Sequence, residues 1–121
     1  MKGKEFVVDY HEIYPSNTLV FAGVDKCDVI KKMQSYLGDD LDLSEVEKHI
    51  NPKFSSLHFF PCGKMVIFFK DEQPSVGIIA HEALHVVERI MEYIGNGDVP
   101  VNETWNYLLE YIVNKIYNEL F

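Results

Sequence analysis

The spacing of apolar residues changes partway along the chain, and this change limits the folds open to it. Up to about residue 70, most apolar residues gather in short runs rich in β-branched and aromatic side chains, which are typical of strands, although residues 25–37 have helical spacing. From residue 74 onward they recur every three or four positions over two long segments, which is typical of amphipathic helices. The 121 residues suffice for one modest core. The sequence therefore predicts a single α+β domain over residues 1–121, in which a small antiparallel or mixed β-sheet packs against helices.

Turn residues divide these segments into elements. We expect strands over 4–10, 18–22, 54–60 and 64–70, and helices over 25–37, 45–50, 74–94 and 101–120. Short turns separate the first two strands and the last two strands, which predicts two hairpins. The run Met65–Phe69 is apolar at every position, which favours an interior strand.

The motif H-E-x-x-H lies inside the helix expected over 74–94, at His81-Glu82-Ala83-Leu84-His85. Because residues four apart share one helix face, His81 and His85 can bind one metal ion. Glu82 is offset by about 100°, beside the ion, where its carboxylate can activate a metal-bound water. A catalytic zinc needs three protein ligands and an open position, so one ligand remains to be found.

The expected third ligand is Glu103, in the first turn predicted for the last helix, and Glu110 is the alternative if the interhelical turn is longer. Glu103, Tyr107 and Glu110 share one polar stripe of that helix. Such a stripe is either a solvent face or, if it faces the site helix, the source of the ligand. In the second case Tyr107 can stabilise an oxyanion, a role for which His58 is a second candidate.

The stretch Ile78–Tyr117 resembles the gluzincin metallopeptidases, the group that includes thermolysin, in which a second helix follows H-E-x-x-H and supplies a glutamate. It is also similar to short phage and prophage metallopeptidases. The resemblance implies a zincin-like pair of C-terminal helices that hold one Zn²⁺ per chain through His81, His85 and Glu103. The resemblance itself implies no particular substrate. From the motif we expect metal-assisted hydrolysis of a peptide bond in a peptide or protein, with Glu82 as general base.

An alternative interpretation is that the chain carries the motif but has no catalytic activity. The chain would then be a non-catalytic phage or prophage accessory protein that acts through protein–protein interaction, with a structural or vestigial metal site. In the plainest reading the two histidines are surface residues and Glu82 is a solvated charge. The chain is small and has little mass for a substrate cleft, so a homodimer or a protein partner is expected to complete one.

Charge and composition bear on partners and location. The formal charge of −8 disfavours binding to nucleic-acid phosphates and to anionic membranes. No apolar stretch approaches the roughly 18 residues of a membrane span, and the N-terminus does not resemble a signal peptide. Cys27 and Cys62 do not form a disulfide framework and are expected to be reduced, buried thiols. We therefore expect a cytoplasmic protein.

Overall fold

The computed structural model describes residues 3–10, 17–37, 48, 50–51, 53–59, 64–93 and 103–121 of the chain. Within these ranges the side chains of four residues are outside the description: Leu37, Phe59, Glu103 and Thr104. The strands are β1 (Lys4–Asp9), β2 (Asn17–Ala22), β3 (Ser56–Phe59) and β4 (Met65–Phe69). The helices are α1 (Lys26–Leu37), α3 (Val76–Tyr93) and α4 (Glu103–Leu120). The helix expected over 45–50 falls largely outside the described residues.

The four strands form one mixed sheet in the order β1-β2-β4-β3. β1 pairs antiparallel with β2, and β3 pairs antiparallel with β4, which confirms both predicted hairpins. β2 and β4 run parallel, with Val20 opposite Ile67. β4 therefore lies inside the sheet, as its uninterrupted apolar run indicated, while β1 and β3 form the edges.

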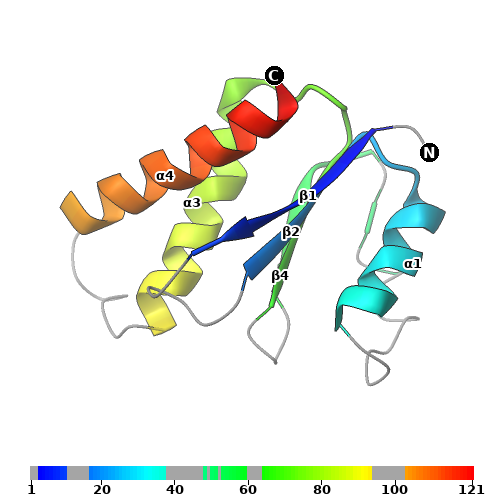
Figure 1. Cartoon of the computed structure of the whole chain (residues 1–121), viewed down its shortest axis with the longest axis horizontal. Helices are drawn as coiled ribbons and strands as arrows, with labels where there is room; N and C mark the ends of the chain where they lie inside the picture. The colour runs from blue at the N-terminus through cyan, green and yellow to red at the C-terminus, as the bar shows by residue number, and fades with distance from the viewer. Residues whose placement is uncertain are drawn as a thin grey trace.

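Each face of the sheet covers its own group of buried side chains, because successive residues of a strand point to opposite faces. Toward α3 and α4 point Val20 and Ala22 of β2 and Met65, Ile67 and Phe69 of β4. Toward α1 point Leu19, Phe21, Val66 and Phe68, which pack with Val29 and Met33 of that helix. Figure 1 shows the result, with α1 on one side of the sheet and α3 and α4 on the other. The observed architecture confirms the predicted α+β class.

α4 covers the sheet through one apolar face. Its fully or nearly buried side chains are Trp105, Leu108, Ile112, Ile116 and Leu120. Polar contacts also tie the helix to β1. The Tyr111 hydroxyl donates to the Asp9 carbonyl at 2.5 Å, and Lys4 Nζ donates to the Glu119 and Leu120 carbonyls at 3.3 and 3.4 Å. The lysine thereby satisfies carbonyls that a helix C-terminus leaves without an internal partner.

α3 begins one residue after Ser75, whose hydroxyl accepts a hydrogen bond from the Ile78 backbone nitrogen at 3.2 Å. A serine in this position caps the first turn of a helix. Pro74, which was predicted within the helix, therefore precedes it. None of the helices that the structure describes is long and apolar enough to cross a membrane. Cys27 is exposed near the start of α1, so the prediction that it is buried is wrong.

Candidate metal and catalytic site

The two histidines of the motif lie next to each other on the outer surface of α3. The side chain of His81 is 68% exposed and that of His85 is 47% exposed. Their ring centroids are 4.9 Å apart and the ring planes are nearly perpendicular. The helix thus brings the imidazoles together as the four-residue spacing predicted.

This separation can be compared with what a shared metal ion requires. Two imidazoles that bind one zinc ion through nitrogens about 2.0–2.1 Å from it, at a near-tetrahedral angle, have ring centroids about 5 Å apart. The observed 4.9 Å agrees with this value. The spacing of the His81 and His85 rings is therefore compatible with two ligands to one ion.

Glu82 lies beside the histidines but is directed inward. The residue is only 4% exposed, because it borders the buried face of α3 formed by Ile79, Ala83 and Val86. Its Oε1 is 4.0 Å from His81 Nε2. Its Oε2 is buried and accepts no hydrogen bond from the described residues. The sequence prediction of a carboxylate beside the imidazoles is compatible with this position, whereas a solvated Glu82 is not.

The surroundings of Glu82 also change its acidity. Burial raises the pKa of the Glu82 carboxyl above its ordinary value, and the nearby His81 and His85 lower it by a smaller amount. The first effect is larger because a carboxylate loses its hydration in the protein interior. A carboxyl with a raised pKa is a stronger base once ionised, which favours acceptance of a proton from water.

A pocket of about 410 Å³ opens beside this group, between α3 and the segment that enters β3. It is lined by Ser55, Ser56, Leu57, Glu82, His85, Glu88 and Arg89. This volume falls within the range of small ligand-binding sites, about 300–1,000 Å³. The pocket gives the buried carboxyl and one of the histidines a common opening. It was not foreseen from the sequence, because β3 and α3 meet only through the tertiary fold.

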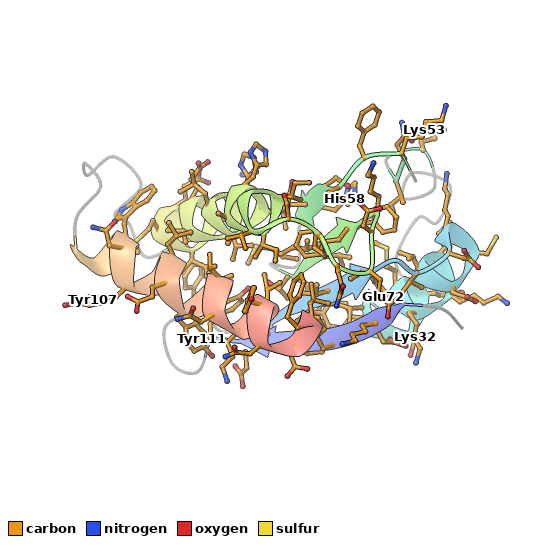
Figure 2. All side chains as sticks on the ribbon, turned by 90° about the horizontal axis from the view of Figure 1, so that it is seen from above. Lys32, Lys53, His58, Glu72, Tyr107 and Tyr111 are labelled. Atoms are coloured by element: carbon orange, nitrogen blue, oxygen red, sulfur yellow. The ribbon has the colours of Figure 1, made fainter. Side chains whose placement is uncertain are left out.

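Of the three residues that α4 was expected to contribute, two are exposed and the side chain of the third lies outside the description. Glu103 is the first residue of α4, as predicted, and its side chain lies outside the description. Tyr107 is 66% exposed and points outward from the helix, and Glu110 is exposed as well (Figure 2). Among the described residues, no group of three or more histidine, cysteine, aspartate or glutamate side chains could hold a metal ion. The described side chains thus provide two ligands, and the third ligand remains a prediction.

His58 lies on the other face of the sheet. It is paired with Val66 across the antiparallel β3–β4 ladder, and directly opposed residues project to the same face. Val66 belongs to the buried group that packs against α1. His58 Nε2 is 2.9 Å from the Ser56 hydroxyl on the same strand (Figure 2). This orientation directs His58 away from α3 and removes the geometric basis for its suggested role as an oxyanion donor.

Comparisons of the chain with protein-family models, with curated proteins and with solved structures find no match. A function for this chain therefore has to be inferred from the residues of α3 and their immediate surroundings.

Proposed function

We propose that this protein is a zinc-dependent metallopeptidase that hydrolyses peptide bonds. One observation carries the proposal: the buried carboxyl of Glu82, one oxygen of which has no hydrogen-bond partner among the described residues, lies beside two adjacent imidazoles whose spacing suits a single ion. An unpartnered buried carboxyl oxygen is costly to a fold, so its presence in native structures calls for an explanation. A base that must accept a proton from a water molecule provides one.

Each residue of the site is proposed to have a separate role. His81 and His85 hold the ion, with Glu103 proposed as the third ligand and Glu110 as its alternative. Zinc in this position supplies a Lewis acid that polarises a peptide carbonyl and lowers the pKa of water toward 7. Glu82 accepts the proton from the attacking water and later gives it to the leaving amine. Tyr107 remains the proposed oxyanion donor, which requires its side chain to move from its exposed position toward the site.

The pocket beside Glu82 suits an extended substrate. The outer edge of β3 is a sheet edge, and Ser56 and Leu57 of that strand line the pocket. A peptide can add to such an edge through main-chain hydrogen bonds. The substrate is therefore proposed to be a peptide or an unfolded protein segment that binds along β3. We further propose that the protein works in the cytoplasm, alone or with a homodimeric or other protein partner.

The decisive experiment compares wild-type protein with Glu82→Gln, after both have been loaded with zinc and shown to hold it equally. The substrates are an unstructured protein and a mixed peptide library, with cleavage followed by mass spectrometry. Loss of a general base is expected to slow cleavage by about 10²–10⁴-fold. The control is Glu92→Gln on the exposed side of the same helix, which should leave the rate unchanged.

Two results would contradict the proposal. Equal cleavage by wild type and Glu82→Gln would assign the activity to another residue or to a contaminant. Absence of cleavage by zinc-loaded wild type would favour the alternative function, a non-catalytic phage or prophage accessory protein with a structural or vestigial metal site. Zinc affinity in Glu103→Ala and Glu110→Ala then identifies the third ligand, because only removal of a true ligand weakens binding strongly.

A further inference from the structure

We infer that Glu88 is a positioning residue for His85: it holds the Nδ1–H of that imidazole and thereby presents Nε2 to the metal ion. The inference rests on the proposed function, since it concerns how the same site is prepared for its ion. It assigns a role to a residue that is not proposed to bind the ion itself.

The two imidazoles differ in which of their ring nitrogens lies near a carboxylate. Oε2 of Glu88 is 3.8 Å from His85 Nδ1, while Oε1 of Glu82 is 4.0 Å from His81 Nε2. On His85 the carboxylate therefore lies on the side of the ring away from Nε2. On His81 it lies beside Nε2. For His85, Nε2 is therefore the nitrogen left to bind an ion.

A neutral imidazole carries one N–H and one lone pair, and a partner on one nitrogen decides which nitrogen has the proton. A carboxylate beside Nδ1 favours the tautomer with Nδ1–H, because the partial positive charge of that N–H is attracted to it. The lone pair is then on Nε2. Metal-binding histidines usually donate their other N–H to a carboxylate or a carbonyl, which fixes the ring and raises its basicity.

Glu88 and His85 lie close to each other because of their spacing along α3. Glu88 follows His85 by three positions, so the two side chains are neighbours on the surface of α3. Both side chains are about half exposed, at 47% for His85 and 46% for Glu88, and both line the pocket beside Glu82. The carboxylate and the imidazole are therefore neighbours at the opening of that pocket.

The chain offers a matched control one turn further on. Glu92 forms an ion pair with Arg89 at 3.5 Å, also with a three-residue spacing on the exposed surface of α3. Glu92 carries the same charge as Glu88 and lies on the same helix, but its described partner is an arginine and not a histidine. Removal of Glu92 therefore reproduces the loss of a surface carboxylate without affecting His85.

The test measures zinc affinity by competition with a chromophoric chelator for wild type, Glu88→Ala, Glu88→Gln and Glu92→Ala. Loss of the Glu88 carboxylate is expected to weaken zinc binding by about 10–100-fold. Glu88→Gln should be intermediate, because its amide oxygen accepts a hydrogen bond without a charge. Glu92→Ala should match wild type. Thermal unfolding of the zinc-free proteins checks that all four are equally folded.

A second readout requires no metal. Nitrogen-15 NMR of the zinc-free protein should show His85 mainly as the Nδ1–H tautomer, with a shift toward Nε2–H in Glu88→Ala and none in Glu92→Ala. Unchanged zinc affinity and tautomer in Glu88→Ala would overturn the inference and leave the proposed function intact. Absence of zinc binding by wild type would overturn the proposed function, and with it this inference.

Discussion

Replacement of Glu82 by methionine is predicted to stabilise the zinc-free protein while it removes the proposed base. Glu82 is 4% exposed and its Oε2 has no hydrogen-bond partner among the described residues. A buried polar group left unsatisfied costs about 1–3 kcal/mol. Methionine has a similar length and no such group, and its flexible side chain adapts to the space available. The free energy of unfolding should therefore rise by about 1–3 kcal/mol.

The assay is urea unfolding at pH 7 in the presence of a chelator. The urea midpoint should rise with an unchanged slope, since the surface exposed on unfolding is nearly the same. For a domain of this size each kcal/mol corresponds to about 3–5 °C in Tm. Glu88→Met is the control, because Glu88 is about half exposed, and its effect should stay within about 0.5 kcal/mol. A loss of 1 kcal/mol or more in Glu82→Met would refute the reasoning, since it would mean that the carboxyl is well satisfied.

Three further predictions concern pH and the fold. The raised pKa of Glu82 means that the zinc-free fold binds more protons than the unfolded chain above the ordinary carboxyl value of 4.5. The unfolding free energy of wild type relative to Glu82→Gln should therefore fall as pH rises from 4.5 through the folded-state pKa, and a flat difference in urea midpoints would contradict this. Gly23 has a φ of 69°, and an added Cβ would stand 2.8 Å from a backbone nitrogen, so Gly23→Ala should lower the unfolding free energy by at least about 1–2 kcal/mol. Gly77→Ala is its control in thermal melts and should be neutral or slightly stabilising, because nothing obstructs a Cβ in that helical turn. Tyr10→Phe should cost about 1–2 kcal/mol by breaking the buried hydroxyl bond to Thr18, and a double variant with Thr18→Val should recover part of this loss in chemical denaturation.

Local patterns in the sequence predicted the elements and several of their pairings. The antiparallel β1–β2 pair and the β3–β4 pair each join strands that follow one another in the sequence, so sequence order suffices to predict them. The parallel β2–β4 pair is different. It joins strands separated by α1 and by β3, and nothing in either strand specifies which distant strand lies beside it.

In the candidate site, too, some features follow from local sequence and others only from the tertiary fold. The side-by-side imidazoles of His81 and His85 follow from helical spacing alone. The burial of Glu82 could also have been read from the sequence, since it lies among buried positions 79, 83 and 86. The face occupied by His58 could have been deduced from strand alternation, because its neighbour Leu57 packs against the opposite core. The pocket between β3 and α3 required the tertiary fold.

The central claim is that His81 and His85 together hold one metal ion. The most direct test is elemental analysis of protein purified without a histidine tag, for wild type, His81→Ala, His85→Ala and His58→Ala. His58 is the control, because it lies on the α1 side of the sheet. We predict about one zinc per chain in wild type and His58→Ala, and strong loss in the other two variants. Wild-type protein that takes up no zinc, even after zinc is added back, would contradict the claim.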